Sequence, residues 1–447
     1  MNKPKELIFN KIELQIIFGF DLGHILLNNE QKNTFNSFRG SKKWLKDLKE
    51  KIETTKQNYI FQNPEFASSS YSSTDRRERS TFSIYYDKTL MPLSFSINDD
   101  NPLHLTEHNI SVKFQKIKLG INGSVTLTSR LSYQSSGLSF NNFIEIYNNK
   151  INIIKEKAHS IVVKLIEMLG SNLTVQFNNQ IRFEKFNQFV DCFEVMDFDY
   201  TIYNNKKMLI HDLYKDDDFL RQLARLFRMS LSNYKNHDID RIKKLLKDDI
   251  GYRKDELWLI NRNRVIRHFP KAEDEFQKRF FNDIVLGCEI FIQHKVALLY
   301  LNQWCIHKYS EIKEIIEGGK YLIPQEFNKL EKIIFEMTNF INIFSDDFYV
   351  QMNIKHSFFN EFMEQLLIKL DLILILKSNR YLLSSLLERL SSISSIITTK
   401  RSIELDTLNY NLSRSVKGIN ITVIIFTILM VLIATSQLIV AVMQYMK

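Results

Sequence analysis

Cysteine, proline and glycine are scarce in this sequence of 447 residues, which contains 3 Cys, 6 Pro and 12 Gly. The cysteines, Cys192, Cys288 and Cys305, are odd in number and lack the CxxC spacing of redox and zinc motifs. A disulfide scaffold is therefore not expected, and a reducing cytosol suits the sequence best. Charged residues interrupt the apolar runs at the start of the chain, so no secretory signal peptide is predicted.

The motifs of common enzyme classes are also missing. The sequence has no GxxxxGKS or GxxxxGKT phosphate loop and no GxGxxG dinucleotide motif. His104, Glu107 and His108 match the HxxEH pattern of inverted zinc proteases, which needs a helix to bring both imidazoles to one metal. Pro102 and a β-like run from Ile110 leave little room for that helix. We predict that the chain is not an enzyme and needs no metal or cofactor; a membrane-anchored hydrolase is the third alternative.

Positive charge is in excess but is not concentrated. The chain has 60 Lys and Arg against 51 Asp and Glu, a formal net charge of +9. Nucleic-acid-binding grooves usually appear as clustered basic patches, whereas this surplus is spread along the chain. General solubility explains it better, and no direct DNA binding is expected.

Charge is absent altogether from the C-terminal tail between Gly418 and Met446. As a helix rising about 1.5 Å per residue, Ile421 to Met443 is long enough to cross a hydrocarbon core of about 30 Å. Most of the flanking positive charge precedes the segment, which favours a cytoplasmic location for the N-terminal part. The flanking cations are Arg401, Arg414 and Lys417 before the segment and Lys447 after it. We predict a single-pass protein of the cell (inner) membrane.

The remaining chain reads as an α+β cytosolic body followed by a long helical stalk and the single C-terminal transmembrane helix. Alternation of apolar residues predicts a β-hairpin over 111–133 and a strand over 193–203, with helical spacing over 158–170 and 217–234. After Pro324 neither proline nor glycine occurs until Gly418, which favours long helices. The predicted regions are a β-rich N-terminal region (1–150), a mixed α/β middle domain (151–323), the stalk (324–417) and the tail (418–447).

An apolar seam follows helical spacing along the end of the stalk. It consists of Leu382, Leu386, Leu390, Ile393, Ile397, Leu405, Leu408, Leu412 and Val416. The seam can pack on the chain's own domain or join copies of the chain, and the sequence leaves both alternatives open.

A second pattern, the tail stripe, lies in the apolar tail. Asn420, Thr427, Ala434 and Ala441 recur every seven residues, and each is followed three residues later by Val423, Met430, Gln437 and Gln444 respectively. Small residues allow close helix approach in lipid, and a buried amide can bond a partner helix or line water. The tail stripe predicts a helix interface or pore lining; the alternative is a chance pattern in a plain anchor.

Anion recognition is predicted at WLINRNRVIRH (258–268). If this segment is one extended strand, its alternate residues share a face. Those with ligand-binding chemistry are Trp258, Arg262, Arg264 and His268. Guanidinium groups beside an aromatic plane suit a nucleotide-like anion. Ordinary salt bridges at a solvated strand edge are the alternative.

The approach to the membrane, VKGINITVIIFTIL (416–429), resembles the end of the stalk helix and the start of the first membrane helix in CorA-like divalent-cation channels. Lys417, Ile425, Phe426 and Leu429 carry the resemblance. The Gly-Met-Asn signature of that family is missing, and only Gly418-Ile419-Asn420 precedes the helix. The resemblance therefore implies the signature-lacking CorA-like effectors found beside type III CRISPR loci, which respond to nucleotide messengers.

Together these patterns predict an oligomeric membrane effector, with channel-like properties, in which the cytosolic body senses a ligand and the membrane bundle opens or disrupts the bilayer. Its expected partners are copies of itself, the lipid bilayer and a nucleotide-like messenger, and antiviral defence is the expected setting. The alternative from another class is a tail-anchored cytosolic binding or scaffold protein without pore activity.

Overall fold

The computed structural model describes most of the body and the C-terminal helix. The described ranges are 6–21, 25–26, 61–66, 93–99, 102–105, 110–119, 124–172, 176–177, 189–202, 208–230, 238–247, 249–251, 254–269, 275–317, 328, 331, 338 and 357–445. The chain forms two compact units, of which the first comprises 1–307 with 336–382 and the second 308–335 with 383–447. Each unit is treated separately below.

Within the described residues of the first unit, nine strands form one mixed sheet in the order β10-β11-β9-β1-β7-β6-β4-β3, with β5 also paired to β6. The strands are β1 (Leu7–Asp21), β3 (Phe61–Phe66), β4 (Leu93–Ile97), β5 (Leu103–His104), β6 (Ser111–Leu119), β7 (Ser124–Ser139), β9 (Phe189–Ile202), β10 (Leu257–Ile260) and β11 (Arg264–His268). Separately, β2 (Ile25–Leu26) pairs with β8 (Gln176–Phe177). Because β1 lies between β7 and β9, strands from both sides of residue 150 share the sheet.

The predicted hairpin over 111–133 is confirmed by the antiparallel pair β6 and β7. Its predicted Asn122-Gly123 turn lies outside the described residues. The alternate residues predicted to share a face of β7 are all buried: Val125, Leu127, Ser129, Leu131 and Tyr133. Alternation therefore located the core face of this strand, because successive side chains point to opposite sides of a sheet.

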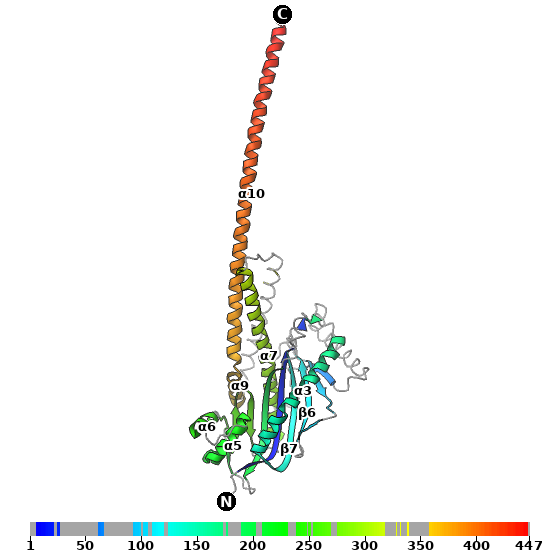
Figure 1. Cartoon of the computed structure of the whole chain (residues 1–447), viewed down its shortest axis with the longest axis vertical. Coiled ribbons are helices and arrows are strands. Elements are labelled where there is room, and N and C mark those ends of the chain that lie inside the picture. The colour runs from blue at the N-terminus through cyan, green and yellow to red at the C-terminus, as the bar shows by residue number, and fades with distance from the viewer. Residues whose placement is uncertain are drawn as a thin grey trace, which may run out of the picture. The chain divides into compact units, whose positions relative to one another are not determined.

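The two faces of the sheet support two separate cores. On one face, alternate residues of β1 such as Leu14, Ile16 and Phe18 pack with α3 (Phe140–Asn172), α5 (Asp217–Arg228) and α6 (Ile239–Leu246). On the other face, Ile17, Phe193 and Val195 pack with α7 (Glu275–Glu317) and α9 (Ser357–Lys369). Figure 1 shows α3 and α7 against the strands of this unit.

Close approach of α7 to the sheet depends on Gly19. A Cβ atom at this position would lie 2.7 Å from Cγ2 of Val296 and 2.9 Å from Cγ2 of Ile292. Both distances are well below carbon–carbon contact distance, so Val296 and Ile292 of α7 would have to shift if residue 19 carried a side chain. Helix α7 therefore packs closely on the sheet at Gly19 because this residue has no side chain.

Helix ends follow local sequence signals. Asp216 accepts hydrogen bonds from the backbone amides of Asp218 (3.0 Å) and Phe219 (3.4 Å), so its side chain caps the start of α5. Between α9 and α10 (Leu372–Tyr445) the break falls at Asp371, whose φ is +57°. Asp tolerates this left-handed conformation better than most residues, so a helix ends here without glycine or proline.

In the second unit, the end of α7 and most of α10 are described. Leu386, Leu390 and Ile393 of the predicted seam are buried. The Arg389 guanidinium lies 4.0 Å from the Tyr309 ring centroid and hydrogen-bonds its hydroxyl. Farther along α10 the seam residues Leu405, Leu408, Leu412 and Val416 are exposed. The seam thus packs within the chain in its first part only.

Candidate functional site

The segment predicted to bind an anion is a hairpin rather than one strand. Trp258 lies on β10 opposite Arg267, while Arg264 and His268 lie on β11. The chain reverses at Asn261–Asn263, where the Asn261 amide donates to the Arg264 carbonyl (2.8 Å). Residues that are directly paired across two antiparallel strands lie on the same face, and Trp258 is paired with Arg267. Trp258 therefore lies on the opposite face from Arg264 and His268, and the prediction that all three share one face is wrong.

The four predicted ligand residues therefore lie in different surroundings. Trp258 is buried in the core beneath α7, whereas His268 is buried on the opposite face, with Nδ1 2.8 Å from the Phe198 carbonyl oxygen. Arg264 is also buried, and Arg262 in the turn is the exposed member of the set, with its Nε 3.9 Å from Asp371 Oδ2. Whether they contact a ligand stays a prediction.

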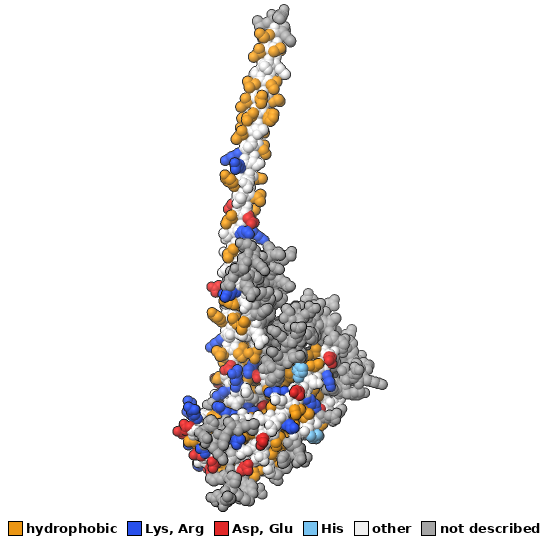
Figure 2. All heavy atoms as spheres, viewed as in Figure 1, with side chains coloured by type: hydrophobic (Ala, Val, Ile, Leu, Met, Phe, Trp, Pro, Cys, Tyr) orange, Lys and Arg blue, Asp and Glu red, His pale blue; other side chains and the backbone are white. Residues whose placement is uncertain are grey.

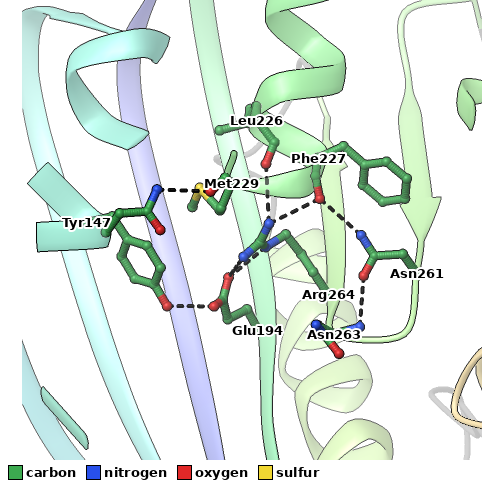
Figure 3. Close-up of polar contacts among 9 residues, drawn as sticks. Tyr147, Glu194, Leu226, Phe227, Met229, Asn261, Asn263 and Arg264 are labelled. Carbon is green, nitrogen blue, oxygen red and sulfur yellow. Dashed lines mark hydrogen bonds and ion pairs between the residues drawn. The ribbon is translucent and has the colours of Figure 1, made fainter. Parts of the chain in front are cut away.

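Arg264 is the centre of a buried polar cluster that joins four elements (Figure 3). Its Nε donates to Glu194 Oε2 at 2.6 Å, and its Nη1 donates to the Phe227 carbonyl at 3.0 Å. The hydroxyl of Tyr147, on α3, donates to the other Glu194 oxygen at 2.6 Å. Burial, followed by the Glu194 charge, raises the pKa of Tyr147 well above its ordinary value. Tyr147 therefore remains a hydrogen-bond donor, and the carboxylate is satisfied from both sides.

This cluster also satisfies the C-terminal end of α5. The last carbonyls of a helix have no partner within the helix, and a cation near them is favourable. Arg264 and Asn261 both donate to the Phe227 carbonyl, and Asn148 donates to that of Met229. Tyr147 and Glu194 were not predicted as site residues. The turn between β10 and β11 had a signal in the sequence, the Asn-Arg-Asn run at 261–263 between two apolar stretches.

Arg267, rather than Arg264, is the guanidinium beside Trp258. Its side chain is 1% exposed and lies 4.9 Å from the Trp258 ring and 5.2 Å from the Phe269 ring. Its Nε is 3.7 Å from Oδ1 of Asp197. Burial raises the pKa of Asp197 to about 6, an effect that the Arg267 charge opposes. Arg267 is enclosed by aromatic rings and has no exposed face on which a base could stack.

Between α7 and the sheet lies a second polar set, here called the α7 seat. It consists of Lys118, Thr128 and Asp191 of the sheet with Glu289 and Lys295 of α7. Glu289 accepts hydrogen bonds from both Lys118 and Thr128. On the other side of Gly19, Lys295 Nζ lies 2.6 Å from Asp191 Oδ2. Opposite charges on the two flanks of α7 thus fix its position over the sheet, because a shift along its axis would leave buried charges unpaired.

The neighbouring His294 should make stability sensitive to acid. Burial lowers the pKa of His294 to about 3, whereas an unfolded histidine titrates near about 6.5. As the pH falls below about 6.5, the unfolded state binds a proton that His294 in the folded state does not bind, so the free energy of unfolding decreases. From about pH 7.5 to about pH 5.5 the loss should be about 1.4 kcal/mol.

Denaturant unfolding of the full chain in mild detergent at both pH values checks this prediction. We expect His294→Met to remove most of this extra loss, while His211→Met, at an exposed position, should retain it. Equal pH dependence in the wild type and His294→Met would contradict it.

The C-terminal part of α10 has a different character. Among the described residues, this is the one helix long and apolar enough to cross a membrane. On the face shown in Figure 2, charged side chains end before the apolar stretch begins. Its threonines are satisfied internally: Thr427 Oγ1 donates to the Val423 carbonyl at 2.8 Å. Gln437 is exposed on this helix, and its side-chain amide can both donate and accept hydrogen bonds.

The zinc alternative gains no support from geometry. His104 lies in β5, while Glu107 and His108 fall outside the described residues. Over the described ranges, no group of three or more His, Cys, Asp or Glu side chains could hold a metal ion.

These features define an α+β protein with a mixed sheet, helices on both faces and a C-terminal helix that could span a membrane. The chain matches no family model, no curated protein and no solved structure.

Proposed function

We propose that this chain is a membrane effector whose tail inserts into the cell membrane and, as several assembled copies, makes the bilayer leaky in response to a ligand bound by the cytoplasmic body. The single observation that carries the proposal is the exposed apolar stretch of α10. In water, exposed side chains such as Phe426 (64%) and Leu432 (61%) would favour aggregation, whereas lipid solvates them.

Several copies are required because one helix cannot enclose a water path. Its backbone is satisfied internally and its outer faces must meet lipid. The tail stripe supplies the polar groups that such an assembly would turn inward, and Gln437 is the member with most to gain from a partner helix.

A cytoplasmic ligand completes the proposal. The resemblance to CorA-like effectors favours a nucleotide-like messenger, and the exposed Arg262 is the predicted residue that such an anion could reach without unfolding the sheet. The proposed ligand class is therefore a nucleotide-like anion.

The tail stripe provides the test. Replacing Thr427 and Gln437 by Leu should preserve insertion, since the helix becomes more apolar, but should weaken assembly. An interhelical hydrogen bond in lipid is worth about 0.6–2 kcal/mol, so leakage should fall by about 3-fold to 30-fold. The measurement is membrane-potential dye response in cells at matched protein levels.

The matched control changes Ile425 and Ile439 to Leu on the opposite helix face, which should leave leakage unchanged. Equal effects of the two pairs, or no effect of either, would make the tail an anchor only. The tethered scaffold would then be the better function.

A further inference from the structure

One side of α10 changes its chemistry where the surroundings of the helix are proposed to change. At about 100° per residue, the exposed seam residues Leu405, Leu408, Leu412 and Val416 fall in one sector about 120° wide. Continuing the same count, the tail-stripe residues fall in that sector too. They are Asn420, Val423, Thr427, Met430, Ala434, Gln437, Ala441 and Gln444. Thus a side that is mainly large and apolar along the stalk becomes richer in small and polar residues along the tail.

The change matches what helix association requires in two solvents. In water, helices associate by burying large apolar side chains, so an interface is apolar. In lipid, apolar side chains gain nothing by leaving the solvent, and interfaces use small and polar residues instead. The rest of the helix follows the complementary rule, with Lys400, Glu404 and Arg414 outside this sector in the stalk.

We infer that this sector is one continuous interface from Leu405 to Ala441, and that its occupant is a parallel, in-register α10 of a second copy of this chain. The partner must change from apolar to small and polar at the same height as α10. A copy inserted into the same membrane from the same side meets this condition, whereas an unrelated soluble protein would cover only the stalk half. This inference rests on the proposed insertion of the tail.

Exposure of the stalk half agrees with this assignment. Leu408 is 64% exposed and Leu412 is 62% exposed, although the seam residues Leu386, Leu390 and Ile393, about four to seven turns earlier on the same helix, are buried. Arg401 falls in the same sector and marks where an apolar contact would end, because facing guanidinium groups repel. Ile403 (60%) and Tyr410 (67%) have the same exposure but point to the opposite side, which provides matched controls.

Cysteine cross-linking of the full-length chain in its membranes tests the inference. Leu408→Cys and Ala434→Cys should each give a covalent homodimer under mild oxidation. Ile403→Cys and Ile425→Cys should give no more than the wild-type chain, which retains its three native cysteines. Equal cross-linking from both faces, or none from Leu408→Cys, would overturn the interface. Cross-linking at Leu408→Cys without Ala434→Cys would overturn its continuity into the membrane.

A second measurement separates assembly from conduction. Changing Leu408 and Leu412 to Glu should shift the complex to monomers when subunits are counted by single-molecule photobleaching, whereas Glu at Ile403 and Tyr410 should leave the count unchanged. All four side chains are exposed, so these changes should not unfold the body. Loss of assembly in both pairs, or in neither, would contradict the inference. Assembly through this face without any membrane leakage would instead leave the interface standing and remove the proposed effector function.

Discussion

Arg264→Ala should lower the free energy of unfolding of the body by about 3–5 kcal/mol, the usual cost of removing one partner from a buried ion pair. Glu194 would remain buried with its charge uncompensated, and the Phe227 carbonyl at the end of α5 would lose a charged donor. Urea unfolding of the full-length protein in mild detergent, followed by circular dichroism, measures the loss. The transition midpoint should fall while the slope stays constant.

Arg262→Ala is the matched control, two residues away and exposed. Its contact with Asp371 is a surface ion pair at 3.9 Å, so its loss should cost no more than about 0.5 kcal/mol. Equal effects of the two substitutions would mean that Arg264 does not hold the cluster together. The comparison also shows that ligand-binding tests should use Arg262→Ala, because Arg264→Ala would weaken the body itself.

Either Lys118→Met or Glu289→Met alone should likewise destabilise the protein by about 3–5 kcal/mol, because each leaves the other charge buried beneath α7. The double substitution removes both charges and should restore most of the loss, since apolar residues of similar volume often replace a buried pair at little cost. The resulting double-mutant cycle isolates the interaction between the two side chains. If the double mutant were as unstable as the sum of the single mutants, the two charges would not act as a pair.

The parts of the fold that the sequence predicts best are those in which apolar and polar residues alternate regularly. In β7, apolar residues alternate cleanly and the core face was correct. The 258–268 segment failed because apolar runs on both sides of Asn261–Asn263 were taken as one strand, and one missed turn exchanges the faces of every later residue. The end of α9 at Asp371 was missed because the expected breakers were only glycine and proline.

Helix α7 shows a different limit. Its buried positions include Glu289, Gln293 and Lys295, so the usual rule that polar residues face water gives no clear pattern along it. Glu289 and Lys295 can be buried because Lys118 and Asp191, far away in sequence, meet them from the sheet. Patterns within the α7 sequence alone could not predict ion pairs with residues so far away in the chain. The polar cluster around Arg264 could not be predicted for the same reason, since Glu194 and Tyr147 are brought to Arg264 only by the fold.

The central claim is that α10 carries the chain into a membrane. Alkaline carbonate extraction of cell membranes, followed by detection of the full-length protein in pellet and supernatant, tests it most directly. The account predicts that the protein stays in the pellet and is released only by detergent, because the apolar stretch up to Met443 lies in the hydrocarbon core. Release of the full-length chain into the carbonate supernatant would contradict it.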